Sequence, residues 1–176
     1  VNQLTNNIVV STVMSNYGFK QAIEKFNFDL IETPVGDKYV AEAMKKYDAA
    51  LGGEQSGHII ISDLLPVGDG LVTLIYVLKA MQHFGVSLSD FKSENLYEYP
   101  QKLTNLELKN KLNDEELEYI NQIALDMSIK KDLDGRYLLR NSGTEPLLRV
   151  LVEAKSNEAM EDFSNELITK INKYLN

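Results

Sequence analysis

Residues 136–154 read RYLLRNSGTEPLLRVLVEA, and this stretch indicates how the C-terminal part of the chain folds. Two apolar runs, 136–140 and 147–154, flank a short polar turn that contains Asn, Ser, Gly, Thr and Pro. Apolar runs on either side of such a turn predict two consecutive strands. An arginine stands at each end of the turn, Arg140 and Arg149, in a chain whose net charge is −8. The placement of these two cations requires a chemical explanation.

The turn offers groups that suit a bound anion. Backbone N–H groups and the hydroxyls of Ser142 and Thr144 lie outside the strand ladder, and Gly143 lets a ligand approach the backbone closely. The guanidinium groups of Arg140 and Arg149 add planar forks that match phosphate oxygens. These residues predict a phosphate-binding turn. The same residue types are common in ordinary hairpin turns with solvated arginines, so the residues alone leave both interpretations open.

A second candidate site is the stretch GGEQSGH, residues 52–58. If this segment is extended, alternate side chains share a face, and Glu54, Ser56 and His58 lie together. A carboxylate beside a hydroxyl matches vicinal sugar hydroxyls, and His58 can act as an acid or a base near neutral pH. The alternative is a glycine-rich turn followed by a histidine at the start of a strand.

Two single residues are weaker candidates. Lys38 opens a predicted helix, where free N–H groups and the helix dipole favour anions, although a solvated surface lysine fits equally well. Asp69 lies between two glycines just before a long predicted helix. We expect it to cap that helix, because a hard cation needs several oxygen ligands and no second carboxylate is close in sequence.

Composition argues against several classes of protein. The chain has 176 residues, 44% of them hydrophobic, which is enough for one or two folded domains. It has no cysteine and only two histidines, His58 and His83, so disulfides are excluded and a zinc site is not expected. The acidic charge argues against a nucleic-acid partner, and no apolar run approaches the ~18 residues of a membrane span. We expect a cytoplasmic protein without a membrane or nucleic-acid partner, and the missing initiator Met predicts a piece of a longer chain.

Strands and helices alternate in the first half of the chain. Strands are predicted over 7–13, 28–33 and 58–62, and helices over 17–26, 35–47 and 68–85. Asn16 is placed to cap the first helix, and Gly85 to end the third. The alternation predicts an α/β layer with parallel pairing up to about residue 86.

The composition changes after residue 86. The polar stretch 87–96 is a predicted linker. Beyond it we expect an acidic helix over 112–127, the two strands of the opening stretch, and a closing helix over 157–175. That order predicts a small second α+β domain.

Taken together, these stretches resemble the α-D-phosphohexomutase superfamily, and within it the bacterial phosphoglucosamine mutase family. GGEQSGHII resembles the sugar-recognition loop of that family, and RNSGTEPLLRVLVEA resembles its phosphate-binding loop. VVSTVMSNYGF, VGDKYV and GDGL have the order and spacing of the family. Gln55 favours the glucosamine members, because phosphomannomutase/phosphoglucomutase relatives typically carry methionine there. Asn141 and Val67 stand where proline and threonine are common, and neither departure removes a charged group.

The resemblance implies a fold class and its boundaries. The expected fold is α/β, with a three-layer α/β domain over 1–86 that contains a mixed, largely parallel sheet. After the linker at 87–96, a smaller α+β domain of the TATA-box-binding-protein-like type covers 97–176. These would be the family's third and fourth domains. A flexible linker would let the second close over the substrate and exclude water.

The resemblance also implies a role for each site residue. Glu54, Ser56, His58 and Lys38 would bind the sugar, with His58 assisting proton transfer. Arg140, Asn141, Ser142, Gly143, Thr144 and Arg149 would hold the phosphate that does not react.

The parent enzyme implied by the resemblance is an isomerase. A phosphoserine donates its phosphoryl group to glucosamine 6-phosphate, and the bisphosphate intermediate reorients before glucosamine 1-phosphate leaves, towards UDP-N-acetylglucosamine and cell-wall synthesis. The serine loop and the aspartates that hold Mg²⁺ have no counterpart in this sequence, so we expect the chain alone to be inactive and to bind no metal. Its partners would be a hexosamine phosphate and the N-terminal domains of a homodimeric parent. The alternatives are a phosphomannomutase/phosphoglucomutase fragment and a free-standing sugar-phosphate-binding module.

Overall fold

The computed structural model describes residues 6–175. The chain divides into two compact units, Val1–Glu98 and Tyr99–Asn176, and each is described by itself. The first unit therefore extends beyond the predicted limit at residue 86. The segment predicted as a linker forms a short, exposed helix, α4 (Leu88–Asn95), which is capped by the side chain of Ser87. The polar residues that suggested an irregular linker are the solvent-facing residues of this helix.

The first unit is an α/β domain built on a four-stranded sheet. Its elements are β1 (Ile8–Thr12), α1 (Tyr17–Lys25), β2 (Asp29–Thr33), α2 (Asp37–Tyr47), β3 (Leu51–Gly53), β4 (Ile59–Ile61), α3 (Gly70–Phe84) and α4. The strand order is β2-β1-β3-β4. β1 pairs in parallel with both of its neighbours, and β4 pairs antiparallel with β3. The sheet is thus mixed and mostly parallel, as predicted.

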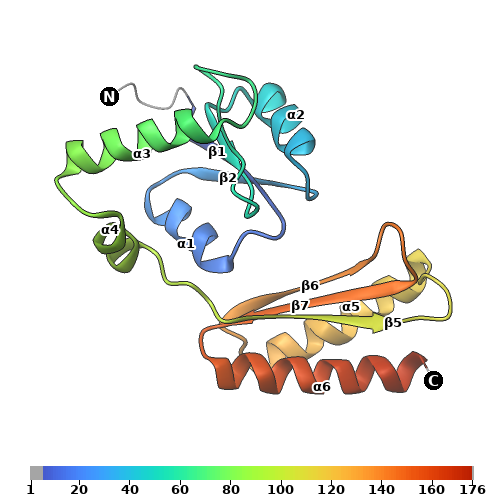
Figure 1. Ribbon diagram of the computed structural model, residues 1–176. Helices are drawn as coiled ribbons and strands as arrows, with labels where there is room; N and C mark the ends of the chain where they lie inside the picture. The colour runs from blue at the N-terminus through green and yellow to red at the C-terminus, as the bar shows by residue number, and fades with distance from the viewer. Residues whose placement is uncertain (1–5, 176) are drawn as a thin grey trace. The chain divides into compact units, whose positions relative to one another are not determined.

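The crossovers of the sheet put α1 and α2 on opposite faces. The connection from β1 to β2 runs in one direction along the sheet, and the connection from β2 to β3 runs back past β1. Parallel crossovers are right-handed, so the two helices must cover different faces (Figure 1). On the α2 side, Val40 and Met44 pack with Val10 and Ile60 in a small buried core.

The predicted helix ends of the first unit are confirmed. The Asn16 side chain accepts a hydrogen bond from the N–H of Gly18 and caps α1. The Asp69 side chain accepts from the N–H of Val72 and caps α3, and α3 ends at Gly85, whose φ of 65° lies in the left-handed region. Such caps satisfy N–H groups that the helix itself leaves free.

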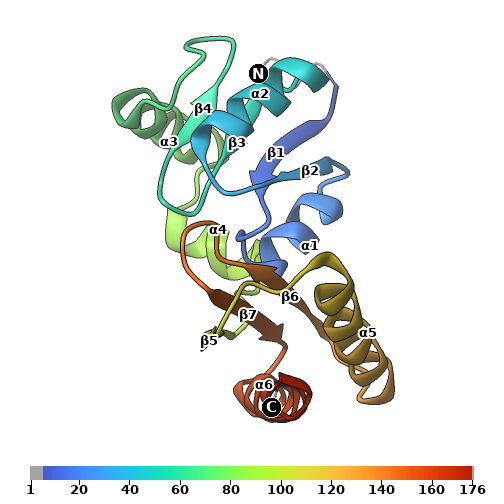
Figure 2. The same cartoon turned by 90° about the vertical axis from the view of Figure 1, so that its right-hand side faces the viewer.

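Helix α3 is unusual because it is strongly apolar and yet has no buried residue. It lies at the outside of the first unit (Figures 1 and 2). Over residues 6–175, no single helix is long and apolar enough to cross a membrane. Only α3 and α4 taken together, with a 77° bend at their break, meet that criterion by length and composition.

The second unit is a three-stranded antiparallel sheet with two helices. Its elements are β5 (Gln101–Glu107), α5 (Asp114–Lys130), β6 (Gly135–Asn141), β7 (Leu147–Ala154) and α6 (Asn157–Leu175). The strand order is β5-β7-β6, so β7 is the central strand. β5 was not predicted, because only Leu103 and Leu106 interrupt its polar sequence.

The two helices of the second unit cover one face of its sheet (Figures 1 and 2). Alternate residues of β7 point to this face, where Leu148, Val150 and Val152 are fully buried against both helices. Phe163 and Leu167 of α6 lie in the same core. The residues between them along β7, which include Arg149, face the other way. The predicted fold class, an α/β domain with a mixed, mostly parallel sheet followed by a smaller α+β domain, is confirmed.

Candidate functional site: an arginine pair at one turn and a carboxylate–hydroxyl–imidazole cluster at another

The register of the β6–β7 hairpin places Arg140 directly opposite Arg149. Opposite residues of an antiparallel pair share a face, and this face is the one that the helices do not cover. Like charges at opposite positions destabilise a sheet. The pair therefore needs an explanation other than the stability of the hairpin.

Neither arginine is neutralised by an acidic side chain. Across residues 6–175, the side chains of Arg140 and Arg149 make no hydrogen bond and no ion pair, and the buried Nε of Arg149 has no partner. Arg136, on the same strand as Arg140, is different because its Nε donates to the carboxylate of the fully buried Glu153. One arginine of the hairpin thus has a structural ion pair, and two present unopposed charge at the predicted phosphate-binding turn.

Two of the predicted phosphate residues already have structural partners. The amide of Asn141 donates through Nδ2 to the Leu112 carbonyl at 2.8 Å and accepts through Oδ1 from the Leu112 N–H at 3.3 Å. Ser142 is buried, its N–H donates to the carbonyl of Leu147, and its hydroxyl accepts from the N–H of Glu145 at 3.4 Å. These contacts shape the turn and leave little of either side chain for a ligand.

The tip of the turn keeps its donors free. Gly143 and Thr144 are exposed, and within the described part of the chain their N–H groups and the Thr144 hydroxyl have no hydrogen-bond partner. No atom lies within 4 Å of the position that a Cβ would take at Gly143, so the backbone there is open to an approaching group. Free N–H groups at an open turn form an anion-binding concavity.

A third cation that sequence reasoning missed lies at the same turn. Lys111 Nζ donates to the carbonyl of Gly143 at 2.6 Å. Arg140, Arg149 and Lys111 thus outnumber the one acidic residue of the turn, Glu145. No local pattern marks Lys111, which lies 32 positions before Gly143 and reaches the turn only through the loop that follows β5.

The second loop, residues 54–58, connects β3 and β4 as a tight hairpin turn. The Glu54 N–H donates to the His58 carbonyl at 3.0 Å, and the Gly57 N–H donates to the Glu54 carbonyl at 3.0 Å. Gly57 has φ of 98°, which side chains other than glycine rarely adopt, so glycine is needed there. The segment is therefore not extended: two turn hydrogen bonds close it, and it has the form of the alternative interpretation, a glycine-rich turn that leads into a strand.

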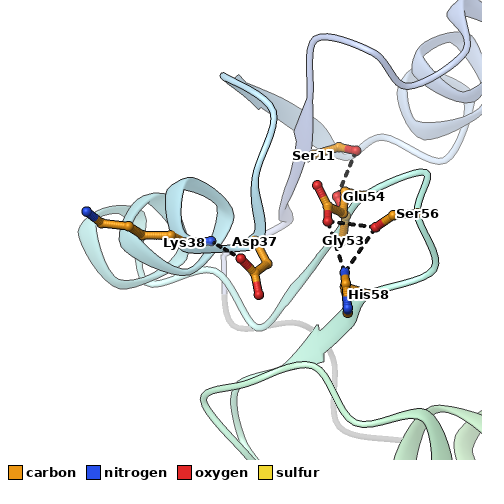
Figure 3. A network of polar contacts seen from close by, with 7 residues as sticks. All are labelled: Ser11, Asp37, Lys38, Gly53, Glu54, Ser56 and His58. Atoms are coloured by element: carbon orange, nitrogen blue, oxygen red, sulfur yellow. Dashed lines mark hydrogen bonds and ion pairs between the residues drawn. The ribbon is translucent and has the colours of Figure 1, made fainter. Parts of the chain in front are cut away.

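The side chains of Glu54, Ser56 and His58 nevertheless lie together, around the Oε1 atom of Glu54 (Figure 3). The Ser56 hydroxyl donates to Glu54 Oε1 at 2.6 Å, and His58 Nδ1 lies 3.0 Å from both Glu54 Oε1 and Ser56 Oγ. The hydrogen bond from Ser56, with further contributions from His58, holds the pKa of the Glu54 carboxyl below its ordinary value. The side chain of Glu54 is 10% exposed and that of His58 is 56% exposed, so the imidazole faces solvent.

Lys38 does not join this cluster. It is the second residue of α2, and its Nζ points away from Glu54 (Figure 3) and lies 3.8 Å from the carboxylate of Glu42. Ser11, the last but one residue of β1, lies nearer to Glu54: its hydroxyl donates to the carbonyl of Gly53 at 3.0 Å (Figure 3). Sequence reasoning did not single out Ser11, which reads as one more small residue of a buried strand.

No metal site is evident in the part of the chain that the structure describes. Over residues 6–175 no three His, Asp or Glu side chains gather as they would around a metal ion. Surface hollows occur between α5 and α6 and beside α2, and neither is lined by a residue of the two loops.

Two family models match the chain one after the other. The model described as Phosphoglucomutase/phosphomannomutase, alpha/beta/alpha domain III, matches residues 1–99. The model described as Phosphoglucomutase/phosphomannomutase, C-terminal domain, matches residues 103–170. The first match alone covers more than half of the 176 residues.

Two curated relatives that resemble this chain carry the same name. Phosphoglucosamine mutase of Streptococcus agalactiae serotype Ia is 47% identical over 161 residues, which are 90% of this chain and 36% of the relative. Phosphoglucosamine mutase of Bacillus subtilis (strain 168) is 42% identical over 166 residues, which are 94% of this chain and 37% of the relative. The chain therefore spans little more than a third of the length of these relatives.

A solved structure shares the fold. The Aspergillus fumigatus N-acetylphosphoglucosamine mutase in complex with GlcNAc-6P and magnesium superposes with a TM-score of 0.76 at 21% identity, over 98% of this chain and 42% of that chain. The order of the two domains and both family matches lead to one assignment. The chain belongs to the phosphohexomutase superfamily, in which it corresponds to the third and C-terminal domains of phosphoglucosamine mutase-like members.

Proposed function

We propose that this chain is the part of a phosphoglucosamine mutase that binds the sugar and the non-reacting phosphate of the substrate. The observation that carries the proposal is the pair Arg140 and Arg149, two cations in direct register without an acidic partner among residues 6–175. A phosphate dianion placed between them would replace repulsion by two charge-assisted contacts. The relatives' name supports an amino-sugar phosphate as the ligand.

The proposed phosphate grip combines side chains and backbone. Arg140 and Arg149 would supply forked donors, Lys111 a point charge, and the N–H groups of Gly143 and Thr144 two neutral donors. Asn141 and Ser142 would act through the shape of the turn that they maintain. Because these groups would contact only the phosphate oxygens of the ligand, the grip would accept a phosphate from either end of the sugar.

The proposed sugar contact is the cluster at Glu54. A carboxylate that stays ionised accepts hydrogen bonds from sugar hydroxyls, and Ser56 adds a group that both donates and accepts. Because a carboxylate can only accept, its contact with His58 places the imidazole proton on Nδ1 and leaves Nε2 as a base toward solvent. Glu54 would thereby orient His58 for proton transfer at a sugar hydroxyl. Lys38 would contribute only through a different rotamer, since its Nζ points away.

In the longer protein we propose the reaction of the relatives' name, the interconversion of glucosamine 6-phosphate and glucosamine 1-phosphate through a phosphoserine and a bisphosphate, in the cytoplasm and towards UDP-N-acetylglucosamine. This chain would position the substrate for phosphoryl transfer rather than carry the phosphoryl group. The described residues do not fit a magnesium site, so any metal ligands would come from outside residues 6–175.

The test is an NMR titration of the ¹⁵N-labelled chain with glucosamine 6-phosphate, mannose 6-phosphate and inorganic phosphate. The proposal expects shifts at 53–58 and 140–149 that are strongest for the amino sugar. Shifts confined to 140–149 with all three ligands would mean that this chain binds phosphate without distinguishing the sugars, and that the rest of the mutase does so. Equal shifts at both loops with mannose 6-phosphate would favour a phosphomannomutase/phosphoglucomutase relative.

A matched pair of variants makes the titration specific. Arg149→Gln removes one charge from the proposed grip, and Lys173→Gln removes one charge from the last turn of α6. Only Arg149→Gln should weaken phosphate binding. Equal weakening by both variants, or the absence of any shift at 140–149, would overturn the proposal.

A further inference from the structure

Helix α3 has the composition of an enclosed helix and the exposure of a surface helix. Its sequence, GLVTLIYVLKAMQHF, has Lys79 as its only lysine, arginine, aspartate or glutamate, and none of its residues is buried. A helix that is apolar all round is normally buried on all sides. Only one side of α3, which includes Val72, Thr73 and Val77, is half-buried in the first unit.

The solvent-facing side is a continuous apolar stripe. Leu71, Leu74, Ile75 and Leu78 are 74%, 53%, 51% and 53% exposed. Their spacing of three, four and seven residues puts them on one face of the helix. We call these four residues the α3 stripe. Contiguous exposed apolar surface of this kind marks an interaction site rather than an ordinary surface.

We propose that the α3 stripe is the surface on which the preceding α/β part of a phosphohexomutase polypeptide docks. The two curated relatives carry nearly two thirds of their length outside the match, since the matched part is 36–37% of each. The second family model describes the C-terminal domain, so the unmatched part of the relatives precedes the matched part. It is therefore joined to the unit that carries α3. The inference rests on the proposed assignment to a longer mutase, but it does not depend on sugar or phosphate binding.

Two other occupants fit the stripe less well. A second copy of the chain would bring together two molecules that each carry a net charge of −8, which opposes association. A membrane surface attracts helices whose polar face is rich in lysine and arginine, whereas α3 carries only Lys79. An apolar face of another domain of the same polypeptide needs no lysine-rich or arginine-rich helix face. Because it is tethered to this chain, it also does not require two separate acidic molecules to associate.

Thiol labelling tests the proposal directly, because the chain has no cysteine. Ile75→Cys places a thiol on the α3 stripe, and Ile129→Cys places a control thiol on α5, where Ile129 is 71% exposed. Each variant is made in this chain and in a chimera in which residues 1–176 replace the matched region of the Bacillus subtilis relative, with all other cysteines replaced by serine. The rate of maleimide modification is followed by mass spectrometry.

In the isolated chain both thiols should react at similar rates. In the chimera the thiol of Ile75→Cys should react more slowly by about tenfold or more, while that of Ile129→Cys keeps its rate. Equal rates for both thiols in a folded chimera would overturn the proposal. Two results with the isolated chain would also overturn the proposal. Protection of Ile75→Cys that grows with protein concentration would indicate that a second copy covers the α3 stripe. Protection that appears only with anionic phospholipid vesicles would indicate that a membrane surface covers it.

A second measurement applies if the chimera does not fold. The separate N-terminal polypeptide of the same relative is added to the isolated Ile75→Cys chain, and protection that saturates with its concentration supports the docking surface. Absence of protection overturns it. No sugar phosphate is present in either experiment, so their outcome is independent of the titration that tests the proposed function.

Discussion

Three arginines lie on one hairpin: Arg136, Arg140 and Arg149. Replacing Arg136 by Gln should change the stability of the chain differently from the same replacement at Arg140 or Arg149. Arg136→Gln leaves the buried carboxylate of Glu153 without its cation and should lower the free energy of unfolding by about 3–5 kcal/mol. Arg140→Gln or Arg149→Gln removes one of two facing like charges, so stability should stay the same or rise by up to ~1 kcal/mol. Urea unfolding measures the first effect, and phosphate titration should show that only the latter two variants lose affinity. A destabilised Arg149→Gln would show that the pair serves the fold.

Lys111 permits a finer prediction at the same turn. Its ammonium is exposed and contacts a carbonyl, so Lys111→Met should weaken phosphate binding only about two- to fivefold, much less than the loss of Arg149. The effect should shrink as salt is added, because exposed charges are screened. Isothermal titration at two ionic strengths gives both quantities. Lys109→Met, two residues earlier, is the control and should leave affinity unchanged.

The Glu54 carboxyl makes stability depend on pH in the acid range. Its pKa in the folded chain is lowered, first by the hydrogen bond from Ser56, so the ionised form is preferred by the fold. The stabilisation is present above the pKa of the unfolded chain and is lost as pH falls through the lowered pKa of the folded chain. Glu54→Gln should therefore be less stable than the parent at neutral pH and approach it as pH falls into the acid range.

Urea unfolding at several pH values between neutral and acid measures how the difference in unfolding free energy between Glu54→Gln and the parent shrinks as pH falls. Ser56→Ala removes the main cause of the shift and should give a smaller difference with the same pH dependence. A difference between Glu54→Gln and the parent that stays constant with pH would contradict the assignment.

At the scale of elements, the start of α5 should contribute measurably to the second unit. Asn113 accepts from the N–H of Glu116, and the Glu116 carboxylate accepts from the N–H of Asn113, which is a reciprocal capping box. Asn113→Ala should cost about 1 kcal/mol of unfolding free energy. Asn110→Ala is the matched control, because no partner of its side chain is found over residues 6–175. Equal effects of the two variants in thermal unfolding would argue against the cap.

Elements with their own sequence signals could be predicted, and those defined by their partners could not. Asn16 and Asp69 mark the starts of α1 and α3 because capping is a local interaction. β5 shows little apolar alternation, and it is a strand because β7 offers it a free edge. α4 has the composition of a linker, and its local signal, the cap formed by Ser87, was missed.

The candidate sites divide in the same way. Glu54, Ser56 and His58 could be named from the sequence because five consecutive residues hold them together, although the sequence left open whether the segment is extended or a turn. The facing of Arg140 and Arg149 depends on hairpin register, and the contact of Lys111 with Gly143 depends on the path of a loop between elements. Neither is encoded in local spacing.

On the scale of the whole molecule, the two units have unequal cores. Among residues 99–175 of the second unit, 13 buried residues form one cluster that joins both helices to the sheet. Among residues 6–98 of the first unit, the corresponding cluster has five buried residues, and α3 adds none. Since buried apolar surface is the main source of stability, the larger unit by length should be the less stable one.

Unfolding of the chain should therefore occur in two steps, with the first unit unfolding at the lower urea concentration. Native-state hydrogen exchange should show β1 and β2 losing protection before β7 and α6. Val40→Ala should lower only the first transition and Leu167→Ala only the second, each by about 2–4 kcal/mol, since both side chains are fully buried in separate cores. A single step for all amides would refute independent units. If the α3 stripe docks as proposed, the chimera should raise the first transition and leave the second where it is, because only the first unit gains buried apolar surface.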